Sequence, residues 1–435
     1  MVLLGLILFF ALFARLFRLN YPNQMYFDEV YHVPSSMLLS EGDFQTPFDP
    51  EQASYDGKHT ADWLHPPLAK YLQAGSMALL GKTPLAWRLP SVGFGLISML
   101  TFYFLLRLLG QNFFFRQLSA EDRKNSAVNL ALLGTFLFSL DGLFLVMSRL
   151  AMNDVFALAW VLLAVLIYVW RLARGRSIYL LLVGVMLGLA LATKWSAWWL
   201  IVVLLLHELG RCRFLAKVPF IFFAMFVTPL FIYLLSYLPA LLGGVSLADF
   251  WTLQKTILLS QLNNPNTHLY SSDPLTWPLN WRPVWFFVAP RDFLPTGFVA
   301  NIYALANPLL GLYGLAALLL AFMTIFARGR MTPAREMVYL LLTLYLANLL
   351  PWIFFKRPLF LHHYLLATPF LLMLVAYFAF QLLSQITDQN ARRAWFFNFL
   401  FWPFLVFVIF YPHWVALPVP ESFVNAVYFW WGNWR

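Results

Sequence analysis

Long apolar segments alternate with short polar stretches along this chain. Several of the apolar segments reach the roughly 20 residues that an α-helix needs to cross a bilayer. On this pattern we predict an all-α polytopic membrane protein with about eleven transmembrane helices. The predicted spans are residues 1–19, 84–108, 127–147, 152–171, 178–193, 195–209, 218–241, 300–326, 336–355, 358–384 and 395–414. No small-residue cleavage site follows the first segment before the next polar stretch, so we expect it to stay as a span.

Basic residues gather in the short connections on one side of this arrangement. They lie at Arg107–Lys124, Arg171–Arg176, Arg211–Lys217, Arg328–Arg335 and Arg392–Arg393. By the positive-inside rule that side is cytoplasmic. We expect a multi-pass protein of the cell (plasma) membrane. We expect one transmembrane domain over residues 1–435, whose first loop (20–83), second loop (242–299) and tail (415–435) lie outside the cytoplasm. Within the first loop, Leu68–Gly81 has the pattern of an amphipathic helix on a membrane surface.

The composition excludes a soluble globular protein. Of the 435 residues, 61% are hydrophobic and 11% are charged, whereas soluble domains carry about 25% charged residues. The formal net charge is +10, which in a soluble protein would suggest nucleic acid. Here the basic residues belong to the membrane topology, so we expect membrane lipids and no nucleic acid as partners. Cys212 is the only cysteine, and no intrachain disulfide is possible.

Two adjacent carboxylates, Asp28 and Glu29, lie in YPNQMYFDEVYHVPSS, just beyond the first span. Neighbours on a helix point about 100° apart, so the two do not form the opposed acid pair of a glycosidase. One of them can act as a single general base. The alternative for such a pair is a solvated loop acid or a helix N-cap. Its place beside the outer membrane face favours chemistry on a lipid-borne substrate.

Several cations lie at or near the membrane on the same side. Arg15 and Arg18 lie at the outer end of the first span, against the positive-inside rule. Either they snorkel to the headgroups or they bind an anion there. Lys194 lies between two apolar spans, where a charge costs about 2.5–3.5 kcal/mol. We expect it to have an anionic partner, either a carboxylate of the protein or a lipid phosphate.

Two further polar clusters fall at outer turns. SRLAMND holds Arg149 and Asp154, and a charged pair at a tight turn is often a structural salt bridge. FFKRPLFLHHYLLATPF combines bases with histidines and a tyrosine, and bases in that position can meet a phosphate. Its polar residues are Lys356, Arg357, His362, His363 and Tyr364.

The histidines and tryptophans each allow a structural and a binding interpretation. His32, four residues after Asp28, could join His65 and the pair His362–His363 as metal ligands. The spacing is not specific and no HExxH or CxxC pattern accompanies it, which favours structural histidines. The Trp- and Pro-rich stretch His268–Phe287 is either an interfacial aromatic belt or a surface of stacking rings for a sugar or peptide.

Seven segments, in order along the chain, resemble those of one enzyme family. They are ARLFRLNYPNQMYFDEVYH, HPPLAK, WRLPSVGFG, SRLAMND, GLALATKWSAWW, SSDPLTWPLNWRP and KRPLFLHHYLLATPF. On these motifs the chain resembles protein O-mannosyltransferases, which are polyprenyl-phosphate-sugar-dependent glycosyltransferases of the GT-C class. Eukaryotic members carry a soluble lectin-like domain in the second loop. The loop here, about 58 residues long, cannot hold one, which favours a bacterial-type member or a reduced one.

The resemblance implies a reaction. Mannose would pass from polyprenyl-phosphate-mannose to Ser or Thr hydroxyls of secreted or membrane proteins, with inversion at the anomeric carbon. The active site would face outside the cytoplasm, and Sec translocation is one setting in which the acceptor would meet it. No cofactor is implied, and a divalent metal requirement is left open.

The same resemblance implies roles for single residues. Asp28 would take the proton of the acceptor hydroxyl, and Glu29 would help to hold the acceptor and the loop. Arg15 and Arg88 match family arginines near the donor phosphate. The full predicted set is Asp28 and Glu29 for catalysis, Arg15, Arg88, Lys194 and Arg357 for the donor phosphate, and His65, Arg149, Asp154, His362, His363 and Tyr364 for acceptor or supporting contacts, with no metal ligand.

Two other functions stay open. A GT-C enzyme that glycosylates a lipid, such as an aminoarabinose transferase, would share most of these features. A transporter of polyprenyl-linked sugars would place its ionisable residues near the bilayer midplane, often in repeated halves. This chain places them at one face and has no internal repeat, which favours an enzyme.

Overall fold

A bundle of long apolar helices makes up most of the molecule. The computed structural model describes residues 2–262, 266–429 and 432–434. The helices of the bundle are α1 (Val2–Leu16), α4 (Pro84–Leu109), α5 (Ala120–Ser139), α6 (Gly142–Met147), α7 (Asp154–Arg174), α8 (Tyr179–Leu191), α9 (Trp198–Arg211), α10 (Val218–Phe222), α11 (Thr228–Ser236), α14 (Pro308–Phe326), α15 (Pro333–Leu349), α16 (Thr368–Ser384) and α17 (Gln389–Val415). Shorter helices outside it are α2 (Glu29–Ser40), α3 (Leu68–Leu80), α12 (Leu238–Leu242), α13 (Leu247–Leu262) and α18 (Glu421–Phe423).

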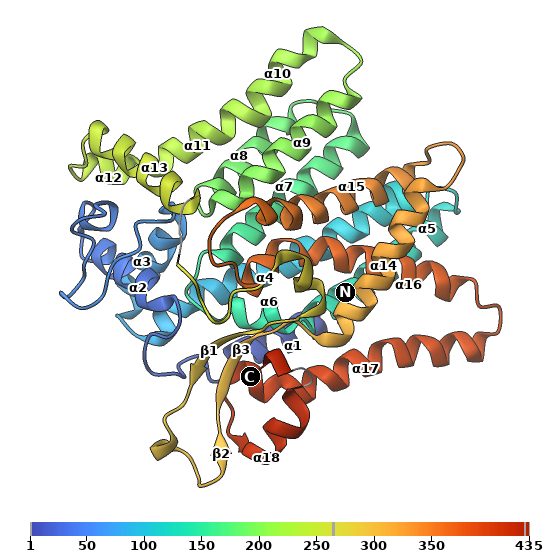
Figure 1. Cartoon of the computed structure of the whole chain (residues 1–435). Coiled ribbons are helices and arrows are strands. Elements are labelled where there is room, and N and C mark those ends of the chain that lie inside the picture. Colours follow the sequence, from blue (N-terminus) through green and yellow to red (C-terminus); the bar gives the residue numbers. More distant parts are fainter. Residues whose placement is uncertain (1, 263–265, 430–431, 435) are drawn as a thin grey trace.

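Short helices lie at one end of the bundle and tight turns between long helices lie at the other (Figure 1). The short helices α2, α3, α12 and α13 gather at its left end in the figure. The turns between α14 and α15 and between α16 and α17 lie at its right end. The core lies around α4, α5, α7 and α16, and nearly every residue of α7 between Asp154 and Val165 is buried. The first and second loops therefore meet at one end of the molecule.

Helix length and hydropathy support a multi-pass membrane protein. Within the described residues, six helical stretches are long and apolar enough to cross a membrane. They are Pro84–Phe114, Asp154–Arg174, Leu215–Leu242, Pro308–Phe326, Pro333–Phe354 and Gln389–Val415. Helices α1, α8 and α16 are apolar but shorter. Each predicted span overlaps a helix, while the number of crossings stays a prediction.

Three predicted spans are interrupted or begin later than expected, and polar caps explain two of them. The span 127–147 breaks after α5, because the Asp141 side chain accepts the backbone N–H of Phe144 at 2.8 Å and starts α6. The span 300–326 begins as a helix only at Pro308, where the Asn307 side chain caps α14. The span 358–384 opens with a separate 3₁₀ helix, Leu361–Leu366, before α16.

A few short strands in the second loop, just before α14 and in the tail add to the predicted helical fold. The strand β1 (Val284–Val288) pairs antiparallel with β3 (Asn301–Ala304), with Val284 opposite Ala304. The strand β2 (Phe298–Val299) pairs with β4 (Val419–Pro420) of the tail. The β-branched and aromatic residues of VWFFV favour a strand over a helix. This hairpin carries Phe286 onto the loop before α2.

The predicted amphipathic helix of the first loop is confirmed as a helix. Its buried residues, Ala69, Lys70, Gln73, Ala74 and Met77, fall on one face at helical spacing. Gly81 ends it at a φ of 81°, a conformation that glycine adopts without strain. The buried face of α3 packs against α2 and α4, which fixes the first loop to the bundle.

Candidate active site

The chain turns sharply just before Asp28. Phe27 adopts a φ of 52°, in the left-handed region that residues other than glycine rarely occupy. Its ring stacks on Phe286 of β1, with 3.7 Å between the ring centroids. This contact offsets the strain of about 1–3 kcal/mol that such a backbone carries. Asp28 follows directly and precedes α2, so its position depends on the hairpin as well as on its own loop.

Glu29 points away from Asp28 into the protein. Its carboxylate is fully buried and accepts hydrogen bonds from Nε and Nη2 of Arg88 at 2.8 and 2.7 Å. It also accepts the backbone N–H of Ala151 at 3.1 Å. Glu29 therefore joins α2 to α4 and to the turn before α7. This placement differs from the predicted acceptor contact, because both carboxylate oxygens are engaged inside the protein.

Asp28 lines a cavity of about 100 Å³ that several distant segments share. The first loop, the turn before α7, the connection between α8 and α9, and the segment before α16 all contribute to it. The predicted site residues that meet here are Asp28, His65, Asp154, Lys194, Arg357, His362 and His363. The other lining residues are His32, Met152, Asn153, Pro358 and Phe360. The predicted residues that lie elsewhere are Arg15, Glu29, Arg88, Arg149 and Tyr364.

Enclosure by the protein makes Asp28 a stronger base. Burial raises its pKa to about 6, against the opposing effect of His32 and with a further contribution from Asp154. A carboxylate with this pKa is ionised at neutral pH and is more basic than a solvated one. Within the described residues, no ion pair or side-chain hydrogen bond occupies this carboxylate. It is free to accept a proton from a bound group.

Lys194 and Arg357 bring positive charge to the cavity. Lys194 Nζ pairs with Asp154 at 2.6 Å, and both side chains are almost fully buried. The prediction that Lys194 needs an anionic partner is thus confirmed, and the partner is a carboxylate of the protein. Arg357 Nη2 lies 3.1 Å from Nε2 of His363. The buried Nε of Arg357 has no hydrogen-bond partner in the described part of the chain.

A second cavity of about 30 Å³ adjoins the first and shares Lys194, Arg357 and His65 with it. Ser196 also lines it, and the buried hydroxyl of Ser196 makes no hydrogen bond to any described residue. Free N–H and O–H donors beside two cations suit an anion, since charge-assisted hydrogen bonds to phosphate are strong. The two cavities together place a candidate anion site next to the carboxylate of Asp28.

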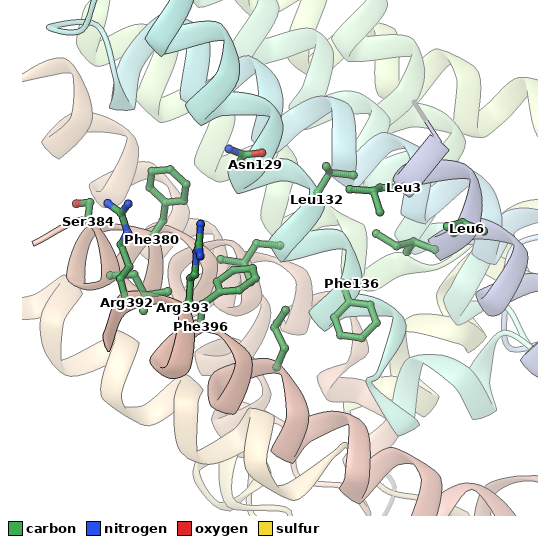
Figure 2. Close-up of a pocket in the computed structure, with 14 residues that line it drawn as sticks. Leu3, Leu6, Asn129, Leu132, Phe136, Phe380, Ser384, Arg392, Arg393 and Phe396 are labelled. Carbon is green, nitrogen blue, oxygen red and sulfur yellow. The ribbon is translucent and has the colours of Figure 1, made fainter. Parts of the chain in front are cut away.

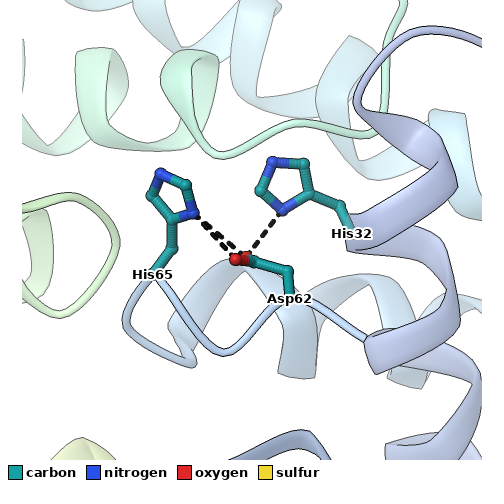
Figure 3. A group of neighbouring side chains, drawn as sticks. All are labelled: His32, Asp62 and His65. Atoms are coloured by element: carbon teal, nitrogen blue, oxygen red, sulfur yellow. Dashed lines mark hydrogen bonds and ion pairs between the residues drawn. The ribbon is translucent and has the colours of Figure 1, made fainter. Parts of the chain in front are cut away.

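Asp62 holds two histidines at the wall of the first cavity. Nδ1 of His32 and Nδ1 of His65 lie 2.9 and 3.0 Å from its carboxylate oxygens. Figure 3 shows that both rings turn this nitrogen toward Asp62 and the other nitrogen away from it. Lys70 of α3 pairs with the same carboxylate at 3.2 Å. Burial alone would raise the pKa of Asp62, but His65, Lys70 and His32 hold it well below its usual range.

His32, Asp62 and His65 also have the residue types of a metal site. One ligand atom from each lies within 4.8 Å of the others, and two histidines with a carboxylate suit zinc by type. The buried ammonium of Lys70, however, already pairs with this carboxylate and would repel a second cation. We interpret the group as a carboxylate that orients two imidazoles. Sequence reasoning missed Asp62, although its place three residues before His65 in ADWLHPPLAK was an available signal.

Arg88 has no donor left for a phosphate. Besides Glu29, it donates to the carbonyl oxygens of Leu19, Pro22 and Gln24 at 2.8–3.0 Å. A guanidinium has five N–H donors, and here each of them makes a hydrogen bond within the protein. The placement therefore differs from the predicted donor contact. Arg88 fastens the loop that carries Asp28.

Arg15 and Arg149 are buried where α1 meets α6. Arg15 is fully buried, its Nε donates to Ser148 Oγ at 2.8 Å, and the guanidinium lies 4.5 Å from the ring centroid of Phe144. It neither snorkels nor lines the cavity. Arg149 donates to carbonyl oxygens at the end of α1, including that of Phe17 at 2.8 Å. The predicted pairing of Arg149 with Asp154 is wrong, because Arg149 caps α1.

Tyr364 and Trp277 of the tryptophan-rich stretch lie outside the cavity and pack next to residues that line it. The Tyr364 hydroxyl lies 3.1 Å from that of Tyr345, outside the cavity. Trp277 is buried, and its ring lies nearly parallel to that of His363, with 6.1 Å between centroids. Its Nε1 donates to Ser272 Oγ at 3.0 Å. This tryptophan is therefore a packing residue, whereas Trp281 and Trp285 are exposed.

Two family models match consecutive parts of the chain. A model described as dolichyl-phosphate-mannose-protein mannosyltransferase matches residues 56–242. A model described as the C-terminal four TMM region of protein-O-mannosyltransferase matches residues 246–434. The chain belongs to the protein O-mannosyltransferase family. The family assignment makes it a mannosyltransferase, and no curated protein matches its sequence.

Solved structures of GT-C enzymes share the fold of this family member. The S. cerevisiae protein O-mannosyltransferase Pmt1–Pmt2 complex bound to the sugar donor matches with a TM-score of 0.80 at 13% identity, over 100% of this chain and 92% of that chain. ArnT from Cupriavidus metallidurans bound to undecaprenyl phosphate matches with a TM-score of 0.56 at 12% identity, over 94% and 70%. The Archaeoglobus fulgidus oligosaccharyltransferase in complex with Zn and sulfate matches with a TM-score of 0.56 at 13% identity, over 98% and 54%. The predicted GT-C fold is confirmed.

Proposed function

We propose that this protein transfers mannose from polyprenyl-phosphate-mannose to Ser or Thr hydroxyls of proteins, with inversion at the anomeric carbon. The observation that carries the proposal is one unpaired carboxylate, Asp28, in a cavity that also holds two cations. The other acid of the cavity, Asp154, is neutralised by Lys194. One free base and one anion site are what a single displacement from a phosphate leaving group requires.

In the proposed reaction, the acceptor hydroxyl oxygen attacks the anomeric carbon from the face opposite the phosphate. The bond from that carbon to the phosphate oxygen breaks, and polyprenyl phosphate leaves with the electron pair. The hydroxyl proton passes to the carboxylate of Asp28. Because one displacement occurs, the configuration at the anomeric carbon inverts. Arg357, Lys194 and Ser196 would stabilise the leaving phosphate, which needs positive charge more than it needs a proton.

The two histidines held by Asp62 have a positioning role in this scheme. An imidazole that donates Nδ1–H to a carboxylate offers Nε2 as a hydrogen-bond acceptor in its neutral tautomer. Both rings line the cavity beside Asp28. We propose that they accept hydroxyl hydrogens of the sugar or of the acceptor and so orient the reacting groups. No metal takes part in this proposal.

The charges of the protein support one orientation in the membrane. The basic loops lie at the end of the bundle away from Asp28, which supports a cytoplasmic location for that end. We propose a plasma-membrane enzyme whose cavity faces outside the cytoplasm, where proteins emerging from the Sec pathway would present their hydroxyls. The donor lipid would enter from the outer leaflet.

The decisive experiment uses membranes that contain this protein, radiolabelled polyprenyl-phosphate-mannose and a Ser/Thr-rich peptide. We expect label on the peptide, unchanged by EDTA, and none with Asp28→Asn. Asp56→Asn, an exposed acid in the same loop, is the matched control and should keep full activity. Label in a lipid fraction and not on the peptide would replace this proposal with a lipid-acceptor enzyme. Full activity of Asp28→Asn would exclude Asp28 as the base.

A further inference from the structure

A large cavity of the described chain lies far from the candidate active site. It has a volume of about 840 Å³ and is bounded by α1, α5, α16 and α17 (Figure 2). Volumes of this size are typical of pockets that hold whole ligands. Its lining from α1 comes from the first turns of that helix, Leu3 to Ile7. Since a helix rises 1.5 Å per residue, Leu3 and Leu16 lie about 20 Å apart, and Asp28 lies beyond Leu16.

The lining of this cavity is amphipathic in the way that a lipid is. Figure 2 shows Arg392, Arg393 and Ser384 together, with Phe380 and Phe396 beside them, and Leu3, Leu6 and Phe136 on the other side of the cavity. The remaining lining is almost wholly apolar. The two arginines lie in the first turns of α17. Neither forms an ion pair with an acidic side chain in the part of the chain that the structure describes.

Cavities adjoin the first half of α17 on two of its sides. A further cavity, of about 510 Å³, lies between this half and Tyr313 of α14. The residues of α17 that line this 510 Å³ cavity include Ala391, Trp395, Asn398 and Trp402. Figure 1 shows the start of α17 running out from the bundle beside α16. In a bilayer, acyl chains pack into apolar grooves of this kind, because unfilled space forfeits packing energy.

We propose that the cavity between α1, α5, α16 and α17 binds one phospholipid with an anionic headgroup. Its phosphate contacts Arg392 and Arg393, and its acyl chains lie along Leu6, Leu132 and Phe136. Guanidinium groups bind phosphate through paired hydrogen bonds, and basic pockets between transmembrane helices select anionic headgroups. The lipid comes from the leaflet at the end of the bundle away from Asp28, so it is distinct from the sugar donor. This inference does not depend on the reaction proposed above.

Native mass spectrometry of the full-length protein tests the proposal. Delipidated protein in detergent is mixed with equal amounts of phosphatidylglycerol and phosphatidylcholine that carry the same acyl chains. We expect one phosphatidylglycerol to be retained in preference. Arg392→Ala with Arg393→Ala should reduce that preference about fivefold for each arginine removed. The matched control, Arg328→Ala with Arg330→Ala, removes two exposed arginines of the neighbouring turn and should leave the preference unchanged.

A second variant tests the cavity itself. Leu132→Trp fills the apolar part and should reduce retention of both lipids while leaving the melting temperature near that of the wild type. Equal retention of the two lipids by the wild type would overturn the proposal. So would an undiminished preference in the double arginine variant, or displacement of phosphatidylglycerol by undecaprenyl phosphate.

Discussion

Two neighbouring carboxylates have opposite environments in this protein. Glu29 is ion-paired and fully buried, whereas Asp28 is unpaired and faces a cavity. The difference follows from their places at the start of α2, since consecutive helical positions point about 100° apart. One of the two can then hold the fold together while the other keeps a raised pKa for chemistry.

The raised pKa of Asp28 predicts how activity depends on pH. Burial raises this pKa to about 6, so the base form is lost as the pH falls through that value. We expect kcat/KM to be constant near neutral pH and to fall about tenfold per unit well below the pKa. The measurement is a pH profile of transfer to peptide. A profile that stays flat down to pH of about 5 would contradict the assignment.

Asp62 should be needed for positioning and for folding. Asp62→Asn removes the charge that orients His32 and His65 and leaves the buried Lys70 without its anion. We expect kcat/KM to fall about 10–100-fold, as when other residues that orient a functional histidine are changed, and the protein to melt at a lower temperature.

The chain offers a matched control for this change. His59 and Asp56 repeat the spacing of His65 and Asp62, but both are exposed. Asp56→Asn should therefore leave kcat/KM and melting temperature unchanged. If Asp62→Asn lowers the melting temperature but the folded fraction keeps wild-type kcat and KM, Asp62 is structural only. Separate determination of kcat and KM on folded protein distinguishes the two roles.

At the scale of elements, a buried ion pair adds to the hydrophobic contacts that hold α2, where Val33 and Met37 pack against Trp87 of α4. Glu29 and Arg88 join α2 to α4, and Arg88 also holds the carbonyl oxygens of the preceding loop. Breaking a buried pair by removing one partner typically costs about 3–5 kcal/mol. The loop that carries Asp28 thus depends on α4 for its shape.

This arrangement predicts different effects for two arginines. Arg88→Ala should lower the free energy of unfolding by about 3–5 kcal/mol, with little change in the KM for the donor of the protein that remains folded. Arg357→Ala should do the reverse, raising that KM about tenfold or more at an unchanged melting temperature. Thermal melts and donor titrations of both variants test the pair. A raised KM for the donor in well-folded Arg88→Ala would support the predicted contact between Arg88 and the donor phosphate.

The sequence predicted the helices well and their interruptions poorly. Long apolar runs determine α4, α7 and α17 because little else can satisfy backbone groups in a bilayer. Asp141 and Asn307 break two of the runs through single caps, which average hydropathy does not detect. The strands of the second loop were missed because their aromatic residues also suit a membrane interface.

The candidate site was predicted in part, and for a physical reason. Motifs place Asp28, Lys194 and Arg357 at one face, and the cavity confirms that they meet. The charge of an arginine does not predict which oxygen atoms will accept its hydrogen bonds in the folded protein. Arg15 and Arg88 were therefore assigned to the donor phosphate, whereas each binds backbone or side-chain oxygens of the protein.

For the whole molecule, charge asymmetry predicts which end faces the cytoplasm. Cys212 lies in the connection between α9 and α10, among basic residues, and is the only cysteine. We expect a membrane-impermeant maleimide to leave it unlabelled in intact cells and to label it in inverted vesicles. In a Cys212→Ala background, Lys58→Cys in the first loop should show the opposite pattern. Labelling of Lys58→Cys only in inverted vesicles would reverse the orientation.

The small volume beside Asp28 has a kinetic consequence. Pockets that enclose small ligands usually measure about 300–1,000 Å³, whereas this cavity measures about 100 Å³. In the proposed reaction, a mannosyl phosphate and an acceptor hydroxyl would exceed this volume, so we expect the walls to separate when the donor binds. Association with the donor would then include this opening step, and its rate would depend on how often the cavity opens. Release of polyprenyl phosphate would require the same opening, so we expect motion of the walls to contribute to the turnover rate.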